Sequence, residues 1–273
     1  MRGNAHVRFG GRSEETGWLK GWYRASLRSN YEHVREGGRV VSMAVIVAYG
    51  VRADGIREVL GIDIGPSEDV AVWRTFLQGL VARGVRGVRL VTSDAHPGLK
   101  QAIAEVFVGA AWMRCRVHFM RNVLARVSKT AQAMVAATVR TIFEQPDRTA
   151  AAAQLRHVCH VLSTRFPAVV QLVEDAESEI LTFYDFPVEH RRQVYSTNPL
   201  ERLNKELKRR SAVVGIFPNR QAVLRLFCAL LAEQNDEWLV GQHRYFSEAS
   251  MAKILNPKEE ETAGPLPPQA AAA

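Results

Sequence analysis

The chain has 273 residues, of which 47% are hydrophobic and 23% charged, and it carries a net charge of +8 at pH 7. This is the composition of a globular protein with a sizeable core, so it excludes wholesale disorder. The longest uncharged apolar stretch, residues 40–51, is shorter than the roughly 20 residues that cross a membrane, and the first residues lack an apolar signal segment. We therefore expect no membrane span and no secretory signal. The cysteines, Cys115, Cys159 and Cys228, are odd in number and widely spaced, which favours a reducing cytoplasm over a disulfide scaffold.

The positive charge is concentrated in two segments. Residues 114–129 contain five basic residues and no acid, and residues 191–210 contain seven basic and two acidic residues. This distribution predicts a polyanion-binding surface, because a ligand such as DNA is bound by clustered cations. A solvated helix face would show the same pattern, and the charge alone leaves both interpretations open.

The first part of the chain predicts strands. Residues 31–64 favour a three-stranded antiparallel meander, with Val- and Ile-rich runs at 39–51 and 58–64 and turns at Gly37-Gly38 and Asp54-Gly55. Ser67 is the predicted N-cap of a helix with apolar residues at helical spacing. A short buried strand over 88–92 and a helix opened by Pro97 follow, which gives the order β-β-β-α-β-α.

The second part of the chain predicts helices. Helical patterns occupy roughly residues 117–183, another helix starts near Pro199, and a last one is expected over 221–236. The tail after Leu255 is rich in Pro and Ala, so we expect residues 256–273 to be disordered.

Asp94 is the first candidate for chemistry. It follows an apolar strand, in the region where α/β sheets place ligand sites, and its carboxylate suits a metal ion. The competing interpretation is a structural one, in which Asp94 forms an Asx-turn or caps the helix that begins at Pro97.

Glu201 is the second candidate. Asn198, Pro199 and Glu201 match the N-cap, N1 and N3 positions of a helix, so a capping box explains the acid without any function. Helical spacing also places Glu201 on one face with Lys205 and Lys208, which suits a metal ion beside a phosphodiester. The apolar residues of the same helix then take the core side: Leu200, Leu203 and Leu207.

Cys115 and His118 form a Cys-x-x-His pair. Zinc needs about four ligands, and no matching pair lies at zinc-finger spacing. We therefore expect a structural role, with Cys115 buried and His118 hydrogen-bonded.

Taken together, these sequence segments resemble those of a known protein family. From Tyr31 onward the chain is similar to bacterial insertion-sequence transposases of the Mutator type, in the segments VREGGRVVSMAV, REVLGIDIGPSED, VTSDAHPGLKQAI, WMRCRVHFMRN, STNPLERLNKELKRR, VVGIFPN and EQNDEW. The resemblance implies an RNase H-like α/β core with a DDE triad of acids and an α-helical insertion between the second and third acids. It also implies DNA transposition, by metal-dependent DNA strand cleavage and transfer of an insertion sequence.

The resemblance assigns roles to individual residues. Asp94 matches the second acid, Glu201 the third, and Cys115 and His118 a pair near the start of the insertion. The implied cofactor is a pair of Mg²⁺ (or Mn²⁺) ions held by the acids. The implied partner is double-stranded DNA, both as transposon ends and as target. The resemblance also implies that the intact protein is a homo-oligomer. It implies a cytoplasmic location, associated with the nucleoid and without a membrane partner. The basic residues expected to contact DNA are Arg116, Arg121, Arg202, Lys205, Lys208, Arg209 and Arg210.

One position departs from the family pattern. The first acid belongs to a segment like Leu-Asp-Ala-Thr-Tyr before VREGG, and here residues 27–31 are Leu-Arg-Ser-Asn-Tyr, with Arg28 in place of the Asp. Glu32 is displaced by about 13 Å along a strand, too far to substitute. We therefore expect a truncated or frameshifted copy, inactive as written. The alternatives are a non-catalytic DNA-binding remnant and a gene fragment without function.

The expected organisation follows from these assignments. Residues 1–30 form a segment outside the family, and residues 31–114 form the first part of the core. Residues 115–190 form the helical insertion, residues 191–255 the C-terminal part of the core, and residues 256–273 the tail.

Overall fold

The computed structural model describes residues 22–195, 197–241 and 244–255. Its strands are β1 (Trp22–Glu36), β2 (Arg39–Arg52), β3 (Arg57–Gly65), β4 (Leu90–Ser93), β5 (Ala111–Arg114) and β6 (Ile216–Phe217). Its α-helices are α1 (Val70–Ala82), α2 (Pro97–Val106), α3 (Arg116–Leu124), α4 (Lys129–Arg140), α5 (Arg148–Leu162), α6 (Pro167–Asp175), α7 (Glu177–Leu181), α8 (Val188–Val194), α9 (Asn198–Ser211), α10 (Arg220–Val240) and α11 (Glu248–Leu255). Two 3₁₀ turns cover Thr141–Glu144 and Thr182–Asp185.

The strands form one mixed sheet in the order β3-β2-β1-β4-β5. β1, β2 and β3 are antiparallel neighbours, as the meander predicts, whereas β4 runs parallel to β1 and β5 parallel to β4. The far end of β1 also pairs with β6. β1 is thus central in the sheet, between β2 and β4.

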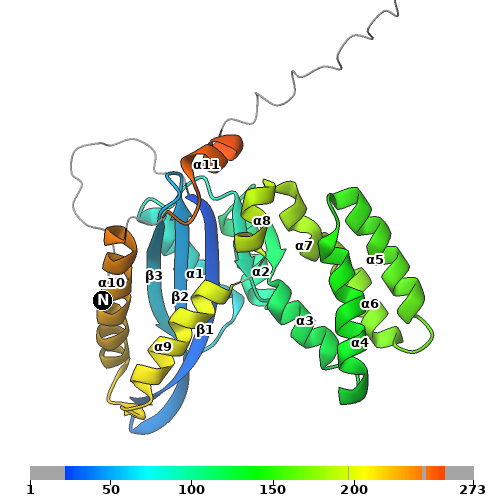
Figure 1. Ribbon diagram of the computed structural model, residues 1–273. Coiled ribbons are helices and arrows are strands. Elements are labelled where there is room, and N and C mark those ends of the chain that lie inside the picture. Colours follow the sequence, from blue (N-terminus) through cyan, green and yellow to red (C-terminus); the bar gives the residue numbers. More distant parts are fainter. Residues whose placement is uncertain (1–21, 196, 242–243, 256–273) are drawn as a thin grey trace, which may run out of the picture.

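Helices cover both faces of the sheet, which is why β2 is buried over most of its length. Alternate residues of β2 face opposite layers, as the strand period requires. Val45, Val47 and Tyr49 pack with α9 and α10, whereas Ile46 and Ala48 pack with α1 and α2. The sheet therefore lies between two helical layers, with α9 crossing in front of β1 in Figure 1.

The remaining helices form a separate part of the core. Helices α3 to α7 bury a cluster that includes Phe119, Val135, Leu155 and Val173, and this cluster reaches the sheet at Met113 of β5. In Figure 1 these helices stand beside the β5 edge of the sheet. The helical character predicted for residues 117–183 is confirmed.

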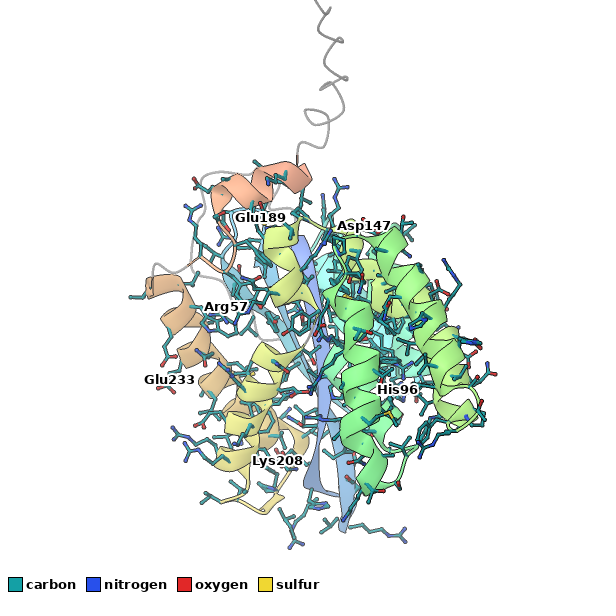
Figure 2. All side chains as sticks on the ribbon, turned by 45° about the vertical axis from the view of Figure 1, so that its right-hand side comes forward. Arg57, His96, Asp147, Glu189, Lys208 and Glu233 are labelled. Carbon is teal, nitrogen blue, oxygen red and sulfur yellow. The ribbon has the colours of Figure 1, made fainter. Side chains whose placement is uncertain are left out.

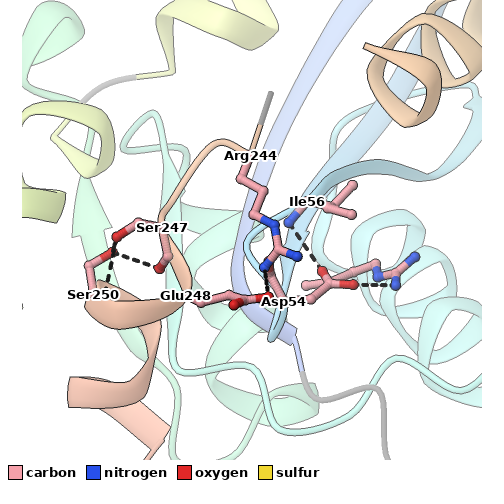
Figure 3. A network of polar contacts seen from close by, with 7 residues as sticks. Asp54, Ile56, Arg244, Ser247, Glu248 and Ser250 are labelled. Carbon is pink, nitrogen blue, oxygen red and sulfur yellow. Dashed lines mark hydrogen bonds and ion pairs between the residues drawn. The ribbon is translucent and has the colours of Figure 1, made fainter. Parts of the chain in front are cut away.

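The C-terminal segment docks on the turn between β2 and β3 (Figure 3). The backbone N–H of Tyr245 donates to Gly55 O at 2.8 Å, and Arg244 Nη1 donates to Asp54 O at 3.3 Å. Gly55 has φ +81°, and a Cβ there would lie 2.1 Å from the carbonyl oxygen of Phe246. The turn therefore needs glycine both for its backbone angle and for the close approach of the segment that ends in α11.

Several boundaries differ from the sequence predictions. The N-cap of α1 is Asp69, whose carboxylate accepts from Val72 N at 2.9 Å, while Ser67 donates to that carboxylate. Strand β5 and helix α11 were not predicted, and α11 follows the helix expected to be the last.

The N-terminal boundary also differs. β1 begins at Trp22, so residues 22–30, placed outside the family core by the sequence, form the first half of a central strand. Residues 1–21 and the tail 256–273 lie outside the described residues. Among the residues described, no helix is long and apolar enough to cross a membrane.

Candidate functional site

Asp94 lies at the C-terminal end of β4 and is half-buried. It does not cap the next helix, because the N-cap of α2 is His96. Its carboxylate accepts no hydrogen bond from the described residues, so neither structural interpretation of Asp94 is seen. β4 is parallel to β1 with Ser26 opposite Thr92, and this register, continued by two residues, brings position 28 of β1 level with Asp94.

Glu201 lies in the first turn of α9 and points toward α3. Its Oε1 is 3.3 Å from His118 Nε2 and 3.7 Å from Arg121 Nη1. The predicted capping box is wrong, because Thr197 rather than Asn198 is the N-cap and its side chain makes no capping bond. Glu201 is therefore held by contacts with another helix rather than by a capping role.

Cys115 connects the end of β4 to the start of α9. Its backbone N–H donates to Ser93 O at 2.7 Å, and its Sγ accepts from the backbone N–H and the hydroxyl of Thr197, at 3.4 and 3.3 Å. The carbonyl of Thr197 in turn accepts from Glu201 N at 2.9 Å. These contacts bring the neighbour of Asp94 and the first turn of α9 to the same end of the sheet.

The Cys115 thiol is completely buried, as the predicted structural role requires. Burial alone would raise its pKa, but hydrogen bonds from His118 and Thr197 outweigh this effect and lower the pKa to about 7. Hydrogen bonds to the Cys115 thiol thus link the start of α3 to the start of α9.

Beside Glu201, α9 and β1 form an open depression of about 620 Å³. The depression is lined by one carboxylate, that of Glu201, and by four basic side chains: Arg121, Lys205, Lys208 and Arg209. Lys208 donates to Tyr31 O at 2.8 Å, which ties α9 to β1, and its place on the lower half of α9 is shown in Figure 2. The predicted face of Glu201, Lys205 and Lys208 is confirmed, with Leu200, Leu203 and Leu207 buried behind it.

Two amides that the sequence analysis did not single out also line the depression. Asn204 is 4% exposed, yet neither its Nδ2 nor its Oδ1 has a hydrogen-bond partner. Asn30 Nδ2, from β1, is likewise buried and without a partner. The sequence offered one indication for Asn204: it lies next to the apolar residues of α9, a position where a polar side chain is unusual and suggests a function.

The other predicted basic residues differ in their availability. Arg116 is half-buried between the rings of Phe143 and Tyr195, at 4.4 and 4.9 Å, and burial lowers its pKa. Arg202 and Arg210 are exposed on α9, although Arg210 pairs with Glu206 at 2.9 Å. The free cationic surface therefore centres on α9 rather than on Arg116.

Glu32 does not replace the missing carboxylate. It is 5% exposed and accepts from Ser211 Oγ at 2.9 Å, with Lys208 Nζ 3.7 Å away. These partners belong to the C-terminal half of α9, whereas Glu201 lies in its first turn. The separation expected from the strand spacing is thus consistent with the contacts.

The donor set does not fit a two-metal centre. Among the described residues, no group of three or more His, Cys, Asp and Glu side chains is arranged to hold a metal ion. Position 28, level with Asp94 in the β1–β4 register, is an arginine, a residue type without an acceptor atom. Asp94 and Glu201 remain as candidate acids, but they lack the third carboxylate that two divalent ions require.

The sequence itself is similar to known transposases. The profile of the family described as "Transposase, Mutator family" matches residues 23–241, so the match starts within β1 rather than at Tyr31. The transposase for insertion sequence element IS1081 of Mycobacterium tuberculosis is 43% identical over 84% of this chain and 57% of that protein. The transposase for IS406 of Burkholderia multivorans is 44% identical over 79% of this chain and 56% of its own length. The transposase for IS256 in transposon Tn4001 of Staphylococcus aureus is 34% identical over 80% of this chain and 56% of its own length.

Solved structures are more distant. The Drosophila P element transposase strand transfer complex matches 85% of this chain and 69% of its own, with a TM-score of 0.29 and 10% identity, which is too low to support a conclusion. The chain spans little more than half the length of the curated relatives that it matches. The extent and identity of the sequence matches show that this chain belongs to the Mutator family of transposases.

Proposed function

We propose that this chain is a transposase-family protein that binds duplex DNA through α9 but does not cleave it. The observation that carries the proposal is the arginine at position 28, level with Asp94 in the β1–β4 register. The family resemblance puts the first of three acids at this position.

The topology supports an RNase H-like core. Three antiparallel strands are followed by two parallel ones in the order β3-β2-β1-β4-β5, with α1 and α2 as the crossovers. In such a core the acids lie on the central strand, at the end of the next strand and on a later helix. Position 28 lies in β1, position 94 directly after β4 and position 201 in α9, which agrees with this arrangement.

The local charges argue against metal-dependent catalysis. Divalent ions would supply a Lewis acid and an activated oxygen nucleophile at such a centre. Here Glu201 is already within reach of His118 and Arg121, and the residue at position 28 is an arginine, a residue type that cannot be a metal ligand. The remaining acids, Asp94 and Glu201, are too few to neutralise two divalent ions.

The charge of α9 supports DNA binding. Its last turn carries Lys208, Arg209 and Arg210, and Lys205 lies one turn earlier. The side chains of these residues are exposed, so they can reach phosphates without unfolding. Each phosphate neutralised releases counterions, which makes the affinity depend steeply on salt.

The test combines a nicking assay with a binding titration. Supercoiled plasmid is incubated with the protein in Mg²⁺ or Mn²⁺, and labelled duplex is titrated by fluorescence anisotropy at several salt concentrations. We expect no nicked plasmid, and a salt-dependent affinity that Lys205→Ala combined with Lys208→Ala weakens more than Arg156→Ala, an exposed arginine on α5.

The two parts of the proposal fail separately. Metal-dependent nicking by the unmodified chain that Glu201→Gln abolishes would overturn the loss of catalysis. An affinity that does not change with salt, or no binding at low salt, would overturn the assignment of α9 as a DNA surface.

A further inference from the structure

We propose that the depression between α9 and β1 is a phosphate-binding site that seats one phosphate of a DNA backbone without a divalent metal ion. The inference deepens the proposed function and rests on it, because it assigns the chemistry of the same face. It follows from the lining of the depression, in which basic side chains and unpartnered amides outnumber the single acid.

The cations of the depression are not equally engaged. Arg209 pairs with Glu206 at 2.6 Å, Lys208 bonds to Tyr31 O, and Arg121 lies 3.7 Å from Glu201. Lys205 has no ion pair or hydrogen bond with any described residue. It is therefore the cation whose charge is available to a ligand.

Asn204 gives the second, independent observation. A buried amide without partners is unfavourable, because it has lost water at both ends and gained nothing in exchange. Since Nδ2 and Oδ1 both lack partners, the argument holds whichever way the amide is oriented. A ligand in the depression resolves this deficit.

A phosphate has the matching chemistry. Its oxygens accept from the amide nitrogens of Asn204 and Asn30 and from the ammonium of Lys205, while a water held by the phosphate donates to Asn204 Oδ1. A divalent cation matches less well, because Asn204 Oδ1 and Glu201 could ligate it but the four basic side chains of the lining repel a cation.

The position of the depression explains why a metal is not required. In a two-metal centre, cations lie between the carboxylates and the phosphate. Here Glu201 lines the depression with Arg121 Nη1 3.7 Å away, so a protein cation already opposes its negative charge. The phosphate charge is then balanced by Lys205 and its basic neighbours.

The experiment measures the binding of labelled duplex DNA by anisotropy, in EDTA and in Mg²⁺, for the unmodified chain and three variants. We expect affinity in EDTA at least as high as in Mg²⁺. Lys205→Ala and Asn204→Leu should each weaken binding about tenfold, the loss of one charge-assisted hydrogen bond, and Arg156→Ala less than twofold. Lys205→Ala should also reduce the slope of log affinity against log salt by about one.

Thermal melts with inorganic phosphate give a second readout that does not depend on DNA. Phosphate should raise the melting temperature of the unmodified chain and of Arg156→Ala, but not of Asn204→Leu or Lys205→Ala. Because Lys205 is exposed, its variant keeps the test decisive if Asn204→Leu does not fold.

The outcomes separate the two proposals. DNA binding that requires Mg²⁺, or that both variants leave unchanged, overturns the phosphate site while the DNA-binding proposal stands. If no DNA binds at low salt, the proposed function fails, and the phosphate melts alone decide the site. A melting temperature that phosphate does not change, or changes equally in every variant, then overturns it.

Discussion

Arg24 tests whether an unusual first strand weakens the core. It lies in β1 with no exposed surface. Its guanidinium donates to Thr92 Oγ1 at 3.2 Å, to Gln193 O at 2.8 Å and to Val194 O at 3.3 Å. The two carbonyls end α8, where the negative end of the helix dipole favours a cation. The charge is therefore well accommodated, although it sits in a central strand.

The energies nearly cancel. Each hydrogen bond from a charged donor contributes about 1.5–3 kcal/mol, whereas desolvation of a buried ion costs several kcal/mol. If Arg24 is replaced by a long apolar side chain, both backbone carbonyls that it contacts keep a hydrogen-bond donor. Gln193 O still accepts from Tyr245 Oη at 3.3 Å, and Val194 O from Thr92 Oγ1 at 3.2 Å.

We therefore predict that Arg24→Met changes the free energy of unfolding by less than about 1 kcal/mol, in the stabilising direction. Arg24→Ala, the matched control, should destabilise by about 3 kcal/mol, because it leaves a cavity of nearly the whole side chain. Urea unfolding followed by circular dichroism measures both. A loss of 3 kcal/mol or more for Arg24→Met would refute the reasoning and show that the buried guanidinium is a net stabilising group.

Three further changes have defined outcomes. Arg28→Asp should create Mn²⁺ binding detectable by calorimetry, since it adds a carboxylate level with Asp94, and Glu201→Gln in the same background should remove it. The pKa of Cys115 is about 7 in the folded protein, against 9.0 for an unperturbed thiol. The thiolate therefore stabilises the fold fully above pH 9, and this stabilisation is lost as the pH falls through 7. Urea midpoints between pH 6.5 and 9.5 should therefore rise with pH by an amount that Cys115→Ser reduces, and equal pH profiles would contradict this. Gly55→Ala should destabilise by about 1–3 kcal/mol and open the C-terminal segment to proteolysis, because φ is +81° and the new Cβ meets Phe246 O; unchanged cleavage would argue against the docking.

Local periodicity was enough to predict most of the fold. The apolar spacing of α9 identified its buried side, because that side is set by the helix repeat alone. The strands β2 and β3 followed from β-branched runs between glycine turns. These elements are encoded by residues close together in the sequence.

Elements that depend on distant partners were missed. β5 has four residues, Ala111–Arg114, and exists through parallel pairing with β4. The segment that leads into α11 is anchored by hydrogen bonds from Tyr245 and Phe246 to Gly55, which is far away in the chain. The choice of Asp69 over Ser67 as N-cap shows the same limit at short range, since both residues suit the position and the carboxylate accepts from Val72 N.

The candidate site shows where sequence resemblance stops being informative. Motif matching identified Asp94 and Glu201, but it could not show that Glu201 faces His118 and Arg121, because those contacts join helices distant in sequence. Nor could it show that Asn204, one turn from Glu201, would be buried with both ends of its amide unpartnered.

These contacts change the chemistry inferred from the same residues. A centre for divalent cations needs acids in excess of bases, whereas the depression beside Glu201 has four basic side chains to one acid. On the proposed function, phosphate affinity depends on the cations and amides that line the depression, and these do not include the residue at position 28, so we expect phosphate binding to persist without a bound metal ion.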